Sequence, residues 1–204
     1  MDEKIKKAEK QLSTADTVLG QLIVTNGHIS HAVRTDYFYS LCRSIVGQQV
    51  SVAAATTIFS RLQDVSGLEP ARVAVLTDEQ AKAIGLSRQK KGYITDLAAH
   101  FVQNPAVYDH LNSLSDEDVI KELCAVKGIG VWTTQMFIMF TLCRLDVFAP
   151  GDIGLQRAMA RLYGDGNPIN TAGLITIADG WRPYRTVACW HLWRSLNNEP
   201  IKKI

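Results

Sequence analysis

The sequence predicts an all-α protein. Apolar residues recur at the three- and four-residue intervals typical of helices, and no segment shows the alternation expected of a half-buried strand. Proline and glycine interrupt this pattern most clearly at residues 164–168 and 180–183. With 204 residues, 47% of them hydrophobic, the chain is long enough to bury a core in one domain or in two small lobes.

In the first half of the chain, the expected helices begin at residues suited to capping. Ser13, followed three residues later by Asp16, has the pattern of a capping box and predicts the start of a helix. Thr77 and Ser87 are expected to cap two further helices, and Pro105 to stop the second of them. Besides the helix that begins at Ser13, this half is predicted to form helices at 37–46, 51–65, 77–85 and 87–101.

In the second half, a short turn that contains glycine separates two expected helices. Ser115 and Asp118 open the first of them, and Val131 begins the second. The remaining helices follow the breaks at proline and glycine. The helices expected after this turn lie at 131–143, 152–163, 171–179 and 183–197.

Bulk properties place only weak limits on function. The net charge of +2 permits nucleic acid as a partner, but a DNA-binding face must come from local clustering of Arg and Lys. The four cysteines are widely scattered and form no Cys-x-x-Cys pair, which argues against disulfide or zinc frameworks and favours a reducing compartment. The charged N-terminus has no apolar signal segment, and the most apolar run, 136–143, is too short to cross a membrane. We therefore expect a cytoplasmic protein that has no membrane contact. We also expect a monomer, which would be nucleoid-associated if the protein is bacterial.

The most informative segment is 123–152, where a glycine-rich turn is followed, one helix later, by an aspartate. Gly128 and Gly130 leave backbone N–H groups accessible at the start of a helix, where the helix dipole favours an anion such as a phosphate. Asp152 follows at the start of the next helix. A backbone anchor and a carboxylate at this separation suit an enzyme that holds DNA beside the sugar it attacks. Taken alone, the same residues also fit a tight αα turn and an ordinary N-cap aspartate.

Five motifs occur in one order along the chain, at 45–51, 85–91, 126–133, 146–152 and 181–185. They resemble the motifs of the helix-hairpin-helix DNA glycosylases, and most closely those of the 3-methyladenine (alkylpurine) branch. The resemblance implies a two-lobed all-α fold with an active cleft between the lobes. The central lobe would span about residues 52–131, and residues 1–51 and 132–204 would form the second lobe.

The resemblance implies a monofunctional DNA glycosylase that removes alkylated purines, of the 3-methyladenine and 7-methylguanine type, and so initiates base excision repair. Asp152 matches the catalytic carboxylate, which stabilises positive charge on the sugar and orients or deprotonates water. Asp146 is the rival acid, but its motif position indicates a structural role. Members that also nick the strand have a Schiff-base lysine two residues after the second hairpin glycine. Trp132 occupies that position here, and Lys127 lies on the wrong side of the hairpin to replace it.

The resemblance also implies a pocket for the flipped base. Trp132 and Trp193 are its aromatic candidates, because an aromatic face can stack on a flipped base and favours a cationic one. Tryptophans at helical spacing are equally compatible with a core. Met136 stands where a well-known alkylpurine enzyme has a tyrosine, and Ile153 rather than an aromatic residue follows the acid. The range of bases is therefore the least determined part of the resemblance.

Residues that contact the DNA backbone or the gap left by the flipped base come from three of the motifs. We favour Gln49 as the side chain that fills the gap, although a Gln-Gln pair also fits a polar loop. Lys90 belongs to the basic cluster at the start of its helix, where a solvated charged face is an alternative. The residues expected to bind double-stranded DNA with damaged bases are Gln48, Gln49, Arg88, Lys91, Lys127, Gly128, Gly130 and Thr133.

No cofactor is expected. Relatives with an iron–sulfur cluster hold it on closely spaced C-terminal cysteines, and this chain has only Cys189 in that region. The resemblance leaves open a monovalent cation on the carbonyls of the hairpin. Two alternatives to the alkylpurine enzyme also stay open. One is a non-catalytic helix-hairpin-helix DNA-binding protein in which Asp152 is only a cap. The other is a glycosylase for a different damaged or mismatched base, for example an oxidised or mismatched pyrimidine.

Overall fold

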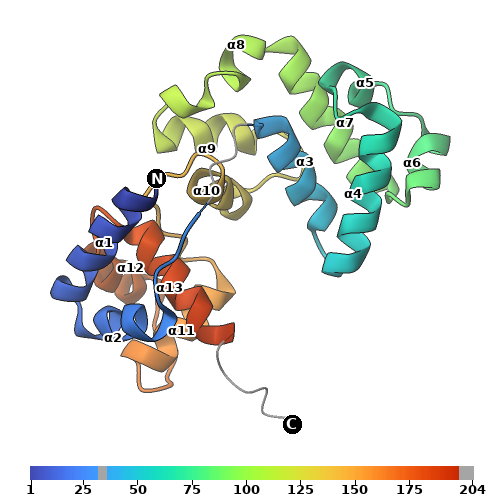
Figure 1. The fold of residues 1–204 in the computed structure, drawn as a ribbon. Helices are drawn as coiled ribbons and strands as arrows, with labels where there is room; N and C mark the ends of the chain where they lie inside the picture. The colour runs from blue at the N-terminus through green and yellow to red at the C-terminus, as the bar shows by residue number, and fades with distance from the viewer. Residues whose placement is uncertain (32–35, 198–204) are drawn as a thin grey trace, which may run out of the picture. The chain divides into compact units, whose positions relative to one another are not determined.

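The computed structural model describes residues 1–31 and 36–197, and within these ranges the chain forms α-helices, one 3-10 helix and no strand (Figure 1). The all-α prediction is therefore confirmed. The chain divides into two compact units, which we name for their place in the sequence. The terminal unit comprises Met1–Val33 and Cys143–Ile204, and the central unit comprises Arg34–Leu142. In the described part of the chain, no helix is both long enough and apolar enough to cross a membrane.

The boundaries of the central unit differ from those expected from the sequence. The unit includes two helices that were assigned to the other lobe, α3 (Tyr37–Gly47) and α10 (Val131–Phe140). The helix α3 packs against α4 (Val52–Ser66) and α7 (Arg88–Gln103), and α10 packs against α9 (Asp116–Cys124) and α3. Because of these contacts, α3 and α10 belong to the central unit. The active cleft expected from the resemblance stays a prediction.

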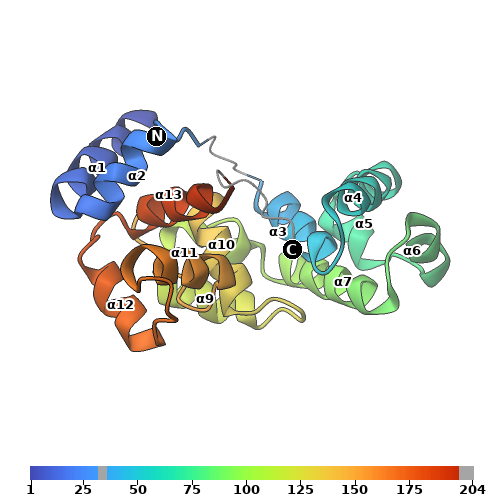
Figure 2. The same cartoon turned by 90° about the horizontal axis from the view of Figure 1, so that it is seen from below.

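The terminal unit joins the first two helices of the chain to the last three. Figures 1 and 2 both show α1 (Asp2–Ala15) and α2 (Thr17–Asn26) side by side. The helix α13 (Arg185–Asn197) packs against both of them and against α11 (Ile153–Tyr163). The remaining helix of this unit is α12 (Thr171–Asp179). The buried core of the terminal unit includes Ile5, Leu12, Leu19, Leu155, Met159, Leu174, Val187 and Leu192.

The helix predicted to begin at Ser13 does not begin there. The helix α1 continues through Ser13, whose hydroxyl donates a 2.8 Å hydrogen bond to the carbonyl of Glu9. Asp16 is the N-cap of the next helix, and its carboxylate accepts hydrogen bonds from the amides of Val18 and Leu19 at 2.9 and 3.0 Å. The two polar residues were therefore correctly placed near a helix boundary, but the aspartate, not the serine, forms the cap.

The central unit is built around α7, which packs against α3, α5 (Pro70–Ala74), α6 (Asp78–Ile84) and α8 (Pro105–Tyr108). Its caps match the sequence pattern. Thr77 forms a capping box with Gln80, and the Ser87 hydroxyl accepts a 3.2 Å hydrogen bond from the amide of Lys90. Pro105 follows the end of α7 as expected, but it also begins a short helix that was not predicted. The short helices are α5 (Pro70–Ala74), α6 (Asp78–Ile84), α8 (Pro105–Tyr108) and the 3-10 helix Leu111–Ser113.

Candidate active site and DNA-binding hairpin

Asp152 lies at the N-cap of α11 and its side chain is almost fully buried, with 8% of the residue exposed. Its Oδ1 accepts a 2.8 Å hydrogen bond from the amide of Leu155. The same oxygen accepts a 2.8 Å hydrogen bond from the indole Nε1 of Trp193. The carboxylate is thus oriented by both the helix that it caps and a side chain from α13. The negative charge lies at the N-terminus of α11, where the helix dipole stabilises it.

The turn before α11 fixes the backbone of Asp152. Its amide donates a 3.0 Å hydrogen bond to the carbonyl of Ala149. One turn into the helix, Gln156 donates from Nε2 to the carbonyl of Pro150 at 2.8 Å. The Pro-Gly-Asp sequence therefore gives a closed turn followed directly by a helix, which holds an acidic side chain at a defined point.

Trp193 has a contact that the sequence did not suggest. It was expected in the base pocket, whereas the structure shows its indole N–H donating to Asp152. The residue lies one helical turn after Cys189, which is fully buried in α13, and α13 packs against α11. Burial raises the pKa of the Cys189 thiol, and the nearby charge of Asp152 raises it further. The stacking role of Trp193 stays a prediction.

Gly154 is a site residue that the sequence analysis missed. A Cβ atom at this position would lie 3.0 Å from Oδ1 of Asp152 and 3.1 Å from Cδ1 of Trp193. The only signal in the sequence is a glycine in the first turn of a helix, where most residues would be better helix formers. Its importance follows from the packing of α13, which the local sequence does not reveal.

The rival acid Asp146 is bound by two arginines. Arg185 donates from Nε to Asp146 Oδ1 at 2.8 Å, and Arg182 donates from Nη1 to Asp146 Oδ2 at 3.0 Å. Arg185 also donates from Nη2 to the Asp146 backbone carbonyl at 2.7 Å. These contacts tie the segment before Asp152 to the start of α13, in agreement with the structural role expected for Asp146.

The hairpin joins α9 to α10 in the central unit. Gly128 has a φ of +80°, a region that favours glycine, and a Cβ there would overlap the ring of Tyr93. Gly130 is the N-cap of α10, with φ −108° and ψ 177°, and a Cβ there would meet nothing within 4 Å. Within residues 1–31 and 36–197, no acceptor is found for the amides of Gly128 and Gly130. These N–H groups are therefore available to an anion, and the binding of a phosphate by the hairpin stays a prediction.

Gln48 supports the hairpin. Its Nε2 donates a 3.0 Å hydrogen bond to the carbonyl of Gly128, and its side chain is half-buried. The next residue, Gln49, is exposed and has a φ of 56°, which is unusual for a residue with a side chain. The two glutamines, predicted together as DNA contacts, thus occupy different environments.

The basic cluster expected at the start of α7 is divided. Lys91 forms an ion pair with Asp78, with 2.8 Å between Nζ and Oδ1. Lys90 turns to the end of α3, where its Nζ donates to the carbonyls of Val46 and Gln48 at 2.7 and 2.5 Å. Burial lowers the pKa of Lys90. Lys90 therefore lies neither on a solvated charged face nor in position to contact a phosphate. The carbonyls at the C-terminus of α3 attract its ammonium group instead.

Two other basic residues stay accessible. Arg88, the first residue of α7, is exposed. Lys127 has a largely exposed side chain and forms an ion pair with Asp96, with 3.1 Å between Nζ and Oδ1. The backbone amide of Lys127 also donates to Asp96 Oδ2 at 2.9 Å, which fixes the turn before Gly128.

The remaining predicted residues lie on α10. Trp132 is 48% exposed, whereas Thr133 is buried, with 7% of it exposed. Thr133 and Met136 line a cavity of about 190 Å³, together with Arg43 and Phe140. The burial of Thr133 limits its contact with a phosphate, and its role as a DNA contact stays a prediction. In the described ranges, no group of His, Cys, Asp and Glu residues could hold a metal ion.

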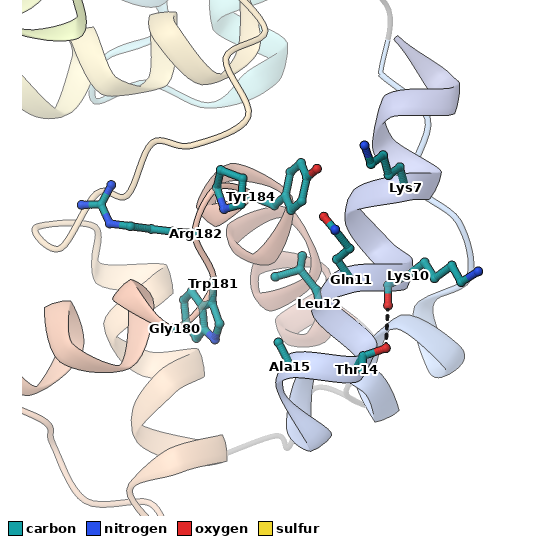
Figure 3. Close-up of a pocket in the computed structure, with 11 residues that line it drawn as sticks. Lys7, Lys10, Gln11, Leu12, Thr14, Ala15, Gly180, Trp181, Arg182 and Tyr184 are labelled. Carbon is teal, nitrogen blue, oxygen red and sulfur yellow. Dashed lines mark hydrogen bonds between the residues drawn. The ribbon is translucent and has the colours of Figure 1, made fainter.

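A larger cavity of about 670 Å³ lies in the terminal unit, between α1 and residues 180–184 (Figure 3). Lys7, Gln11 and Tyr184 line it from its two sides. Trp181 also lines it and donates from Nε1 to Asp16 Oδ2 at 2.8 Å. None of the predicted site residues lines this cavity.

The hairpin and the buried aspartate define the class to which the protein belongs. Residues 42–176 match the family model of the HhH-GPD superfamily base excision DNA repair proteins. The chain belongs to this superfamily.

Three similar proteins have names that refer to 3-methyladenine in DNA. The crystal structure of a DNA-3-methyladenine glycosidase from Bacillus halodurans is similar with a TM-score of 0.85 and 36% identity, covering 94% of this chain and 89% of that one. The Schizosaccharomyces pombe 3-methyladenine DNA glycosylase Mag1, in complex with abasic DNA, is similar with a TM-score of 0.81 and 25% identity, covering 94% and 97%. The DNA-3-methyladenine glycosylase of Saccharomyces cerevisiae is 36% identical over 149 residues, which are 64% of this chain. The chain spans 48% of that yeast enzyme and 63% of a Bacillus subtilis relative.

Proposed function

We propose that the protein is a monofunctional DNA glycosylase that hydrolyses the N-glycosidic bond of alkylated purines in double-stranded DNA and so initiates base excision repair. The observation that carries this proposal is the buried carboxylate of Asp152, oriented by the Leu155 amide and the Trp193 indole. Superfamily membership and the names of the similar proteins support the reaction class.

One carboxylate is sufficient for this chemistry. When the bond between C1′ and the purine nitrogen breaks, its electron pair leaves with the base and positive charge develops on the sugar. Asp152 stabilises that charge by electrostatic attraction, which is strong in a buried position. A purine alkylated at N3 or N7 is already cationic, so it leaves without prior protonation.

Water completes the reaction. Its oxygen forms the new bond to C1′, and its proton passes to Asp152 as general base. The products are a free base and an intact strand with an abasic site. We propose the absence of strand cleavage because Trp132, which has no amine, occupies the position at which nicking relatives have a lysine.

DNA contacts come from the hairpin and from exposed residues of the central unit. The amides of Gly128 and Gly130 bind a backbone phosphate, which positions the DNA without reading its sequence. Arg88 and Lys127 add positive charge. The exposed indole of Trp132 provides a face on which a flipped cationic base can stack.

Base release from randomly methylated duplex DNA, with the released bases identified by mass, tests this function. We expect free 3-methyladenine and 7-methylguanine with the wild-type protein and none with Asp152→Asn. Duplex binding without release of any base would instead establish a non-catalytic DNA-binding protein. Release of bases only from DNA with oxidised or mismatched pyrimidines would instead identify a glycosylase for a different base.

A further inference from the structure

The first turn of α11 contains a residue whose lack of a side chain serves the site. Gly154 is the second residue of this helix, directly after Ile153. It has a helical backbone, so its conformation does not require glycine, and helix propensity alone favours alanine. The reason for glycine at this position must therefore be the space that a side chain would fill.

That space is taken by the two partners of one hydrogen bond. In a helix the Cα–Cβ bond points toward the N-terminus, so a Cβ at residue 154 would point toward the N-cap. It would lie 3.0 Å from Oδ1 of Asp152, 3.1 Å from Cδ1 of Trp193 and 3.2 Å from Nε1 of Trp193. The acceptor and the donor of the 2.8 Å bond would thus both be too close to the added carbon.

Asp152 and Trp193 differ in how far they can move away from an added methyl group. Trp193 projects from α13, which is held against α11 with Cys189 fully buried one turn earlier. The Asp152 carboxylate can rotate about its side-chain torsions, although this weakens its bond to the Leu155 amide. An added methyl group would therefore mainly turn the carboxylate or lengthen its bond to the indole.

We propose that Gly154 is a positioning residue, which lets the Trp193 indole reach Asp152 and fix the direction of its carboxylate. The proposal rests on the function of Asp152 proposed above. In this arrangement, Gly154 and the indole N–H of Trp193 act through the carboxylate and not on the substrate. A side chain at 154 should therefore lower the rate of bond cleavage while the affinity for DNA is kept.

Four variants test the proposal: Gly154→Ala, Trp193→Phe, the double variant, and Gly92→Ala as the matched control. Gly92 is also within a helix, α7, and a Cβ there would meet nothing within 4 Å. In single-turnover release of 7-methylguanine from methylated duplex, we expect Gly154→Ala to be slower by about tenfold or more, because small misplacements of a catalytic group are costly. The affinity for DNA should be unchanged, and Gly92→Ala should match wild type in both measurements.

The double variant separates positioning from a merely structural effect. Trp193→Phe has already lost the indole N–H, so adding Gly154→Ala should slow base release little further. This non-additivity is expected only if both residues act through the same hydrogen bond. Multiplicative losses, or a loss of DNA affinity together with the rate, would overturn the proposal.

A second readout does not depend on activity. The indole N–H resonance of Trp193, assigned by its loss in Trp193→Phe, should shift in Asp152→Asn and shift again, with faster hydrogen exchange, in Gly154→Ala. An unchanged resonance in Gly154→Ala would overturn the positioning role, whether or not the protein releases bases. If wild type released no base while the resonance behaved as expected, the proposed function would fail and the arrangement of Gly154, Trp193 and Asp152 would stand.

Discussion

Gln48 donates a 3.0 Å hydrogen bond from its side-chain Nε2 to the backbone carbonyl of Gly128. The loop after α3 thereby supports the hairpin whose amides we propose to bind a phosphate. Lys90 supports the same loop through the carbonyls of Val46 and Gln48. Since Gln48 is engaged with the hairpin, we propose that Gln49 is the member of the pair that enters the DNA.

Replacing Gln49 by glycine should slow base release without lowering the free energy of unfolding. The left-handed conformation of Gln49, with φ 56°, is unfavourable for a residue with a side chain and costs about 1–2 kcal/mol. Gln49→Gly should therefore leave the free energy of unfolding unchanged or raise it by up to ~1 kcal/mol. Base release should nevertheless slow, because nothing fills the gap left by the flipped nucleotide.

The measurement compares urea unfolding with single-turnover base release. Gln48→Ala is the matched variant, since it should weaken binding to undamaged duplex through the loss of hairpin support. If Gln49→Gly released bases at the wild-type rate, Gln49 would not be the residue that fills the gap.

Asp152→Asn should abolish catalysis with little effect on folding. The asparagine keeps an oxygen that can accept from the Leu155 amide and the Trp193 indole, so the free energy of unfolding should change by less than about 1 kcal/mol. Without a negative charge to stabilise the developing cation, base release should fall by orders of magnitude. Binding to a duplex with an abasic site should persist and can be measured by fluorescence anisotropy. Normal base release would remove Asp152 from the mechanism.

The reaction should leave the DNA strand intact. Because Trp132 has no amine to form a Schiff base, nicks should appear on denaturing gels only after hot alkali or an added endonuclease. Borohydride present during turnover should trap no covalent complex. A trapped complex, or a nick without further treatment, would show that another amine acts as nucleophile and that the enzyme is bifunctional.

Much of the fold could be predicted because caps are local signals. A capping side chain bonds to a backbone amide two or three residues later, as Thr77, Ser87 and Ser115 do, so sequence alone locates the helix start. The helix α1 was missed because charged residues dominate its sequence, although Ile5 and Leu12 are buried along one face. The boundaries of the central unit could not be predicted from the local sequence either, since they follow from contacts between helices far apart in the chain.

The site shows the same division between local and long-range information. Asp152 could be predicted from a turn and a helix start adjacent in sequence. The indole donor and Gly154 could not, because they depend on α13 packing against α11, and the bonded pair is 41 positions apart in the sequence. The hydrogen bonds of Lys90 could not be predicted for a similar reason, since its carbonyl partners lie at the end of a helix more than 40 positions earlier.

The stability of the terminal unit should depend on the protonation of His28. Its Nε2 lies 2.7 Å from Asp2 Oδ1 and its Nδ1 lies 2.7 Å from Glu9 Oε2. These hydrogen bonds, first that of Asp2 and then that of Glu9, raise the pKa of His28 above its ordinary value of 6.5. The folded state therefore binds the proton more tightly than the unfolded state. The resulting stabilisation is fully present below pH 6.5 and is lost as the pH rises through the folded-state pKa.

Urea unfolding of wild type and His28→Gln at a series of pH values tests the direction of this pH dependence. The difference in unfolding free energy should be largest below pH 6.5 and should shrink as the pH rises. His191, buried on the other side of Glu9, has a pKa lowered by burial and remains in both proteins. His110→Gln, in the central unit, is the matched control. A difference that grows with pH would contradict the assignment of His28.

Gly130→Ala should test the hairpin more cleanly than a change at Gly128. At Gly128 any side chain would overlap the ring of Tyr93, and the φ of +80° is unfavourable for a residue with a side chain. An alanine there is therefore expected to distort the turn itself. At Gly130 the backbone is extended and the added methyl group meets nothing within 4 Å, so the fold should be kept, with a small loss of stability because alanine is a poorer N-cap than glycine. The methyl group would nevertheless occupy space that a phosphate needs to approach the amides.

We therefore expect Gly130→Ala to weaken duplex binding to a similar extent for every sequence, because phosphate contacts position the DNA but do not specify it. The slope of log affinity against log salt should become shallower by about 0.9 if one phosphate contact is lost. Gly92→Ala should change neither quantity, and thermal unfolding of both variants checks the fold. If Gly130→Ala bound undamaged duplex as well as wild type, with the same salt dependence, the hairpin would be a turn between two helices and not a phosphate-binding site.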